Sequence, residues 1–136
     1  MMTKFRTTLL IVLCIVIIVY VIKDYNSSND PMLSQLREDL IKVDPRASQL
    51  SFYKGDKSYS INKHKIYLCL NDKYGNYYSK NTLMYVSLHE LAHCLNKFDT
   101  GHSDAFYNMF RILLHKAHVM GLYNPNLAIP DNYCQT

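Results

Sequence analysis

A run of sixteen uncharged and almost entirely apolar residues near the amino terminus, Thr7 to Ile22, limits what the rest of the chain can fold into. Lys4 and Arg6 precede this run, and Lys23 follows it. A transmembrane helix needs roughly 20 residues, and flanking lysine and arginine stems can extend a shorter one. Because no Ala-x-Ala pattern follows, a cleaved signal peptide fits less well. We predict a transmembrane anchor over residues 1–24, with a signal peptide or a buried core segment as alternatives.

The charges around this segment indicate its orientation. The amino terminus, Lys4 and Arg6 lie before it, whereas Lys23 is offset by Asp24 after it. By the positive-inside rule we expect a single-pass membrane protein whose amino terminus is cytoplasmic and whose remaining part lies across the membrane. Residues 25–30 are polar and are interpreted as a short linker. Residues 31–136 are then left for one domain with a modest core.

Composition and cysteine content exclude little else. The net charge is +4 and the lysines are spread along the domain, so no basic stripe argues for nucleic-acid binding. Cys14 lies in the apolar run, whereas Cys69, Cys94 and Cys134 lie in the domain. Three cysteines define no disulfide framework, although one pair can form if the domain is lumenal.

The pattern of apolar residues after the anchor predicts an α+β domain. Asp30 and Pro31 have the form of a helix start, and leucines at helical spacing extend the helix over Pro31–Val43. Three short segments that favour strands follow, separated by turn residues. They predict a three-stranded antiparallel sheet from Leu50–Tyr53, Tyr59–Ile61 and Lys65–Leu70.

Two more helices are expected after the sheet. The first runs from about Lys80 to Phe98, with Ser79 or Asn81 as its N-cap, and the second from Asp104 to about Met120. In the first of these helices, one face can enter the core and a second face carries two histidines. The core face consists of Met84, Leu88, Leu91 and Leu95.

The second face carries the motif His89-Glu90-Leu91-Ala92-His93. At 3.6 residues per turn, His89 and His93 project from the same side of the helix, so two imidazoles can reach one metal ion. Glu90 lies about 100° round the helix, beside the pair, where its carboxylate can act as a general base. This pattern predicts a zinc hydrolase site with places for a third ligand and a water.

The third ligand is expected where the chain turns back after this helix. Gly101 allows the turn and His102 follows it, which makes His102 the best candidate. Asp99 and Asp104 are possible acceptors for an imidazole N–H. Other residues fit less well because they point away, begin a strand or lack a neighbouring carboxylate: Cys94, His64, His115 and His118.

The motif, the short gap, the segment Gly101-His102-Ser103-Asp104-Ala105-Phe106 and the helix after it resemble the WLM and SprT-like metallopeptidases, which are small zincins. The likeness covers roughly Ile66 to Tyr133. The closing Asn132-Tyr133-Cys134 is similar to the ending of small WLM-like proteins of large DNA viruses, although Gln135 stands where those have Gly.

This resemblance implies a zincin-like domain in which a short antiparallel sheet packs on the metal-binding helix, with flanking helices. It implies His89, His93 and His102 as Zn²⁺ ligands and Glu90 as the catalytic base. Members of these families cleave proteins, some of them crosslinked to DNA. The expected function is therefore that of a membrane-tethered zinc metalloendopeptidase formed by residues 31–136, with a protein or peptide as substrate and nucleic acid only by analogy.

Several points stay open at this level. One alternative is a catalytically inactive or structural zinc-binding module that binds other proteins, and another is a structural membrane protein in which the motif is accidental. A second oxyanion donor is wanted, for which Tyr77, Tyr78 and Tyr123 are candidates. A substrate backbone could add to an exposed sheet edge, for which we favour the strand that contains Ile66–Leu70.

Overall fold

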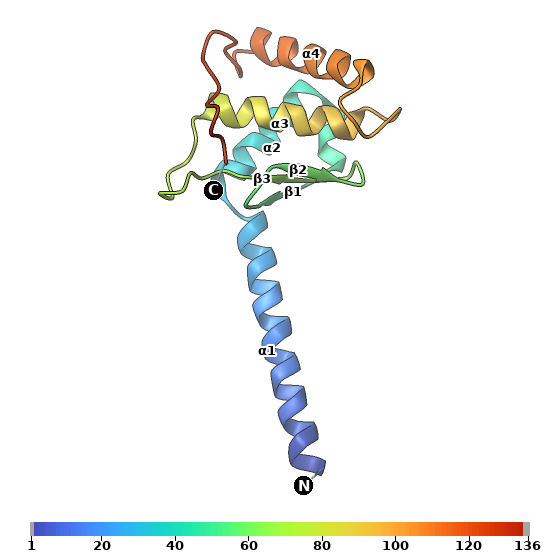
Figure 1. Ribbon diagram of the computed structural model, residues 1–136, viewed down its shortest axis with the longest axis vertical. Helices are drawn as coiled ribbons and strands as arrows, with labels where there is room; N and C mark the ends of the chain where they lie inside the picture. Colours follow the sequence, from blue (N-terminus) through green and yellow to red (C-terminus); the bar gives the residue numbers. More distant parts are fainter. Residues whose placement is uncertain (1, 135–136) are drawn as a thin grey trace.

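The computed structural model describes residues 2–134 and has an α+β architecture (Figure 1). Met1 at the start of the predicted anchor, and Gln135 and Thr136 at the end of the predicted domain, lie outside the described residues. The elements are α1 (Met2–Ser28), α2 (Pro31–Val43), the 3₁₀ helix η1 (Pro45–Gln49), β1 (Ser51–Lys54), β2 (Tyr59–Ile61), β3 (Lys65–Leu68), α3 (Lys80–Leu95) and α4 (Asp104–Val119).

Helix α1 extends away from the rest of the protein (Figure 1). The span Thr3–Ser28 is long and apolar enough to cross a membrane, and its apolar stretch is not buried against the domain. An amino-terminal signal sequence has the same properties. The helix continues through most of the predicted linker, where the hydroxyls of Ser27 and Ser28 donate to the Asp24 carbonyl. Little chain therefore separates α1 from the domain.

The sheet is mixed, so the prediction of an antiparallel sheet is wrong. Its strand order is β1-β3-β2, with β2 antiparallel and β1 parallel to β3. Asn62 and Lys63 have φ values of 53° and 56°, the geometry of a tight hairpin turn, which makes β2 and β3 antiparallel. The connection from β1 to β2 instead crosses the end of β3. Turn residues in the sequence do not distinguish such a crossover from a hairpin.

This topology makes β3 the central strand. Lys65 pairs with Ser51 on one side and with Ile61 on the other. The strand ends at Leu68, two residues earlier than predicted. It has no free edge for a substrate, so the expectation of binding along Ile66–Leu70 is also wrong. The free edges of the sheet belong to β1 and β2.

The helices α3 and α4 pack on one side of the sheet, with α4 farther from it than α3 (Figure 1). The predicted core face of α3 is confirmed, since Met84, Leu88, Leu91 and Leu95 are all buried. Ile66 and Leu68 of β3 join the same core. Ser79 caps α3 by accepting from the Thr82 amide, and the helix ends at Leu95, three residues before the predicted end. Packing of this apolar face on the sheet fixes the orientation of α3, and with it the direction of the opposite face.

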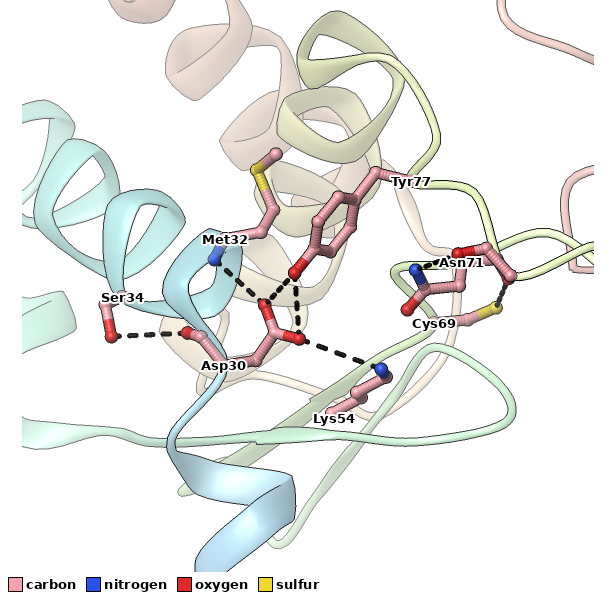
Figure 2. A network of polar contacts seen from close by, with 8 residues as sticks. Asp30, Met32, Ser34, Lys54, Cys69, Asn71 and Tyr77 are labelled. Atoms are coloured by element: carbon pink, nitrogen blue, oxygen red, sulfur yellow. Dashed lines mark hydrogen bonds and ion pairs between the residues drawn. The ribbon is translucent and has the colours of Figure 1, made fainter.

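Asp30 joins three parts of the domain near the end of α1 (Figure 2). Its carboxylate accepts from the Met32 amide at 2.9 Å, which caps α2, and from the Tyr77 hydroxyl at 2.9 Å and 3.1 Å. Lys54 at the end of β1 lies 3.7 Å from the same carboxylate.

We expect Asp30→Ala to destabilise the domain by about 2 kcal/mol. The substitution removes a helix cap worth about 1 kcal/mol and a hydrogen bond to a charged acceptor of similar worth. Chemical denaturation of the full chain in detergent measures the effect, with Asp56→Ala in an exposed loop as control. Equal stability of the two variants would contradict the linking role of Asp30.

Candidate metal centre

Three imidazoles converge at one end of α3. The Nε2 atoms of His89 and His93 are 3.2 Å apart, those of His93 and His102 are 3.1 Å apart, and those of His102 and His89 are 3.2 Å apart. Nitrogens that bind one zinc ion tetrahedrally at 2.0–2.1 Å are about 3.3 Å from one another. The three Nε2 atoms are thus grouped closely enough to share a metal ion.

Local structure explains how these rings meet. His89 and His93 lie one turn apart on α3, and His102 lies in the loop just before the N-cap of α4, Ser103. The fully buried ring of Phe106 lies against all three imidazoles, with centroid distances of 4.9 Å to His89, 4.2 Å to His93 and 4.9 Å to His102. Phe106 therefore forms an apolar support for the triad, beyond the core role that helical spacing predicts.

Burial favours the neutral imidazoles of His89 and His93. It lowers the pKa of His89 to about 4, with the charges of His93 and His102 contributing further in the same direction. Burial also lowers the pKa of His93, followed by the charges of His102 and Lys63. A neutral imidazole has the free lone pair that a metal ion requires, so the environment favours metal binding at neutral pH.

Glu90 is buried beside the triad. Only 6% of its surface is exposed. Burial raises the pKa of its carboxyl to about 7, and a hydrogen bond with Ser60 of β2 opposes part of this rise. A carboxyl with a pKa close to neutral can both accept and return a proton at low cost, as general acid–base catalysis requires.

A cavity of about 340 Å³ lies next to His89 and Glu90. Its other walls are largely aromatic or aliphatic and include Tyr85, Val86 and Tyr133. The Tyr133 hydroxyl donates to the Cys69 carbonyl and shares a hydrogen bond with the Ser58 hydroxyl, both at 2.6 Å.

The tyrosines that line the cavity differ from those proposed on the sequence. Tyr77 lies at Asp30, and the Tyr78 hydroxyl accepts from the Cys134 amide. Tyr123 packs against Tyr85 with ring centroids 6.0 Å apart. Of the twelve tyrosines, Tyr85 and Tyr133 line the cavity with Glu90. Sequence reasoning missed Tyr133 because only the folded tail brings it there.

A disulfide between Cys69 and Cys134 holds this tail against the strand side of the domain. The sequence left the pairing open. Cys94 is free and buried, and burial raises its thiol pKa to about 11, which fits its exclusion as a ligand. His115 and His118 are exposed on α4, outside the triad.

The loop that carries His102 is held by Lys63 from the β2–β3 turn. The Lys63 ammonium donates to three backbone carbonyls, those of His93 at 2.9 Å, of Asp99 at 2.6 Å and of Asn96. These are carbonyls at the end of α3 and in the following loop. The Asp99 side chain accepts from Asn96 and from Ser103, at 3.2 Å and 2.6 Å. Asp99 thus orders the loop and is not the imidazole acceptor that the sequence suggested.

We expect Lys63→Met to weaken metal binding by about 10- to 100-fold, the effect typical of losing an outer contact that orients a ligand. Lys63→Arg should recover part of the affinity because the positive charge and the donors remain. Competition with a chromophoric zinc chelator measures both variants. Wild-type affinity in Lys63→Met would show that the loop needs no support from the hairpin.

Two viral proteins are similar to this chain. "Uncharacterized protein 136R" of Invertebrate iridescent virus 6 is 40% identical over 90 residues, which are 64% of this chain and 50% of that protein. "Uncharacterized protein 042R" of Invertebrate iridescent virus 3 is 43% identical over 88 residues, which are 64% of this chain and 55% of that protein. The chain thus spans about half the length of these relatives. No known family profile matches the chain, and no solved structure matches it significantly.

Proposed function

We propose that this protein is a zinc-dependent metalloendopeptidase with a zincin-like domain that α1 tethers to a membrane. The observation that carries the proposal is the meeting of three imidazole Nε2 atoms, 3.1–3.2 Å apart, beside a buried carboxyl whose pKa is raised to about 7. His89, His93 and His102 would hold Zn²⁺, which when bound acidifies a water and polarises a carbonyl. Three protein ligands leave a position open for that chemistry.

Glu90 performs the proton transfers in this proposal. Its carboxylate accepts a proton from the attacking water and delivers it to the nitrogen of the leaving amine. Burial makes the carboxylate a stronger base than an exposed glutamate, because desolvation disfavours its charge. Ser60 of β2 lies near the same carboxyl and offsets part of the rise that burial causes in its pKa.

The substrate in this proposal is a protein segment in extended conformation. The free edge of β2 offers backbone groups beside the site, since Ser60 of β2 contacts Glu90. The adjoining cavity of about 340 Å³ suits one apolar side chain, because Tyr85, Val86 and Tyr133 line it. Specificity would then depend mostly on one residue next to the cleaved bond.

The domain in this proposal lies in an oxidising compartment, across the membrane from a cytoplasmic amino terminus. The Cys69–Cys134 disulfide favours this side, because reducing compartments keep thiols free. The charges that flank α1 favour the same orientation.

A structural or inactive zinc-binding module is the second candidate, and the number of ligands argues against it. Structural zinc sites usually have four protein ligands, and among residues 2–134 the histidine triad is the group able to bind a metal. A purely structural site also gives no role to the buried Glu90 carboxyl, for which residues 2–134 provide no ion pair with a lysine or arginine.

Full-length protein in detergent provides the test. Zinc content, measured by mass spectrometry, should be one ion per chain, and hydrolysis of unfolded protein substrates should stop with chelation and return when zinc is restored. Bound zinc without hydrolysis of unfolded, folded or DNA-bound substrates would favour the binding module. Absence of bound zinc would reject both candidates.

A further inference from the structure

Among residues 2–134, no helix packs along the face of the sheet that is turned away from α3 and α4 (Figure 1). On its inner face Ile66 and Leu68 are buried toward α3, so the alternating residues of the strands point the other way. These are Ser51 and Tyr53 of β1, Tyr59 and Ile61 of β2, and Lys65 and Tyr67 of β3. We call this set the outer face.

Three tyrosines cross the outer face as a stack. The Tyr67 ring lies between those of Tyr53 and Tyr59, with centroid distances of 5.1 Å and 4.8 Å and interplanar angles of 24° and 8°. Tyr59 and Ile61 remain 42% and 38% exposed. Aromatic and aliphatic side chains that adjoin one another on an uncovered face are typical of a surface that meets a partner.

The position of α1 identifies that partner. Figure 1 shows that α1 leaves the domain on the sheet side, away from α3 and α4, and α1 contacts β1. Beyond Ile22, the last residue of the apolar run, α1 continues only through Lys23–Ser28, which is about 9 Å of helix. The polar headgroup layer of a bilayer is itself roughly 5–8 Å thick on each side. The domain therefore starts where the headgroups end.

We propose that the outer face rests on the phospholipid headgroups of the membrane that α1 spans, an inference that depends on the proposed anchor. Tyrosine favours the headgroup layer because its ring is apolar and its hydroxyl can stay hydrogen-bonded to water. The three strands contain two lysines and no carboxylate, and Lys65 on the outer face can meet lipid phosphates.

The stack itself argues against nucleic acid as the partner. Base binding requires free ring faces. Both faces of the central Tyr67 ring are covered by its neighbours, and Tyr53 and Tyr59 each have one face taken up by Tyr67, which leaves little free ring surface for stacked bases. If the domain rests on its outer face, the histidine triad lies on the far side of the sheet, away from the bilayer. Protein segments in the aqueous phase can then reach the triad.

Because the chain contains no tryptophan, a single introduced tryptophan is a clean reporter. Tyr59→Trp reports from the outer face, and Ile112→Trp, at a position 52% exposed on α4, is the matched control. Each full-length variant is inserted in phosphatidylcholine vesicles, with or without phosphatidylglycerol, that carry a headgroup nitroxide quencher. Emission of Tyr59→Trp should fall by about half and shift to the blue, whereas Ile112→Trp should change far less.

Adding Lys65→Glu to the Tyr59→Trp variant should lower the ratio of docked to undocked protein about fivefold in the phosphatidylglycerol vesicles. Circular dichroism checks that the fold persists.

Equal quenching of the two reporters in protein that floats with vesicles would overturn the docking, and failure to float would overturn the anchor with it. Stronger quenching by an oligothymidylate than by the vesicles would assign the face to nucleic acid. Zinc content and peptidase activity are separate readouts, so the proposed function can fail independently.

Discussion

Glu90→Gln should retain stoichiometric zinc and lose peptide hydrolysis, with kcat reduced by about 10²–10⁴-fold, the usual contribution of a general base. The amide has nearly the same size and can keep its place beside Ser60, but it cannot accept a proton from water. Zinc content by mass spectrometry and initial rates on an unfolded protein substrate give the two values. Glu38→Gln is the matched control, because Glu38 is the other glutamate of the chain and is exposed on α2.

The same substitution should stabilise the metal-free protein. The pKa of Glu90 is raised from an ordinary value of 4.5 to about 7 in the folded state, so the unfolded state ionises first as pH rises. Folded stability therefore falls between about pH 4.5 and about pH 7 and then stays lower by about 3 kcal/mol. Glu90→Gln has no carboxyl to ionise and therefore lacks this loss of stability. The variant should be about as stable as the wild type at low pH and more stable by the full difference above neutral pH. Thermal unfolding with chelator present measures it.

These two results together distinguish the roles of Glu90. Lost activity with a gain in metal-free stability identifies a carboxyl that is retained for chemistry at the expense of the fold. Lost activity together with lost zinc would make Glu90 a support for the ligands. Unchanged activity would remove Glu90 from the mechanism altogether.

His102→Ala should reduce zinc affinity by more than about 100-fold, which exceeds the 10- to 100-fold effect of losing an outer contact. The imidazole supplies one of three converging nitrogens, and His89 and His93 alone would hold the ion with two. Activity should fall with zinc occupancy and recover partly at high zinc. Chelator competition gives the affinity, and His115→Ala removes an exposed histidine of α4 as control.

A wild-type zinc affinity in His102→Ala would remove this residue from the site and leave the His89–His93 pair without its third ligand. The metal-free stability of this variant should differ little from wild type, because the ring is exposed. A large loss of stability without metal would instead make His102 a packing residue. The comparison thus separates ligation from folding.

The sequence by itself determined the features that depend on neighbours within a turn or two. Helical spacing places His89 and His93 on one side of α3, and the Asp30-Pro31 pair starts α2 where predicted. The apolar run is likewise visible in the sequence, since its length and composition decide whether it can span a membrane. Such features need no knowledge of where the rest of the chain goes.

Only the tertiary structure decided the contacts between distant segments. The pairing of Cys69 with Cys134 spans 65 residues, and the ammonium of Lys63 reaches carbonyls 30 to 36 residues away. The parallel pairing of β1 with β3 likewise depends on a crossover that resembles a hairpin in the sequence. Periodicity and caps report only local energies, whereas these contacts depend on which surfaces the whole chain can bury together. The motif therefore supplied two of the three candidate ligands, and the fold brought His102 and the supporting contacts to them.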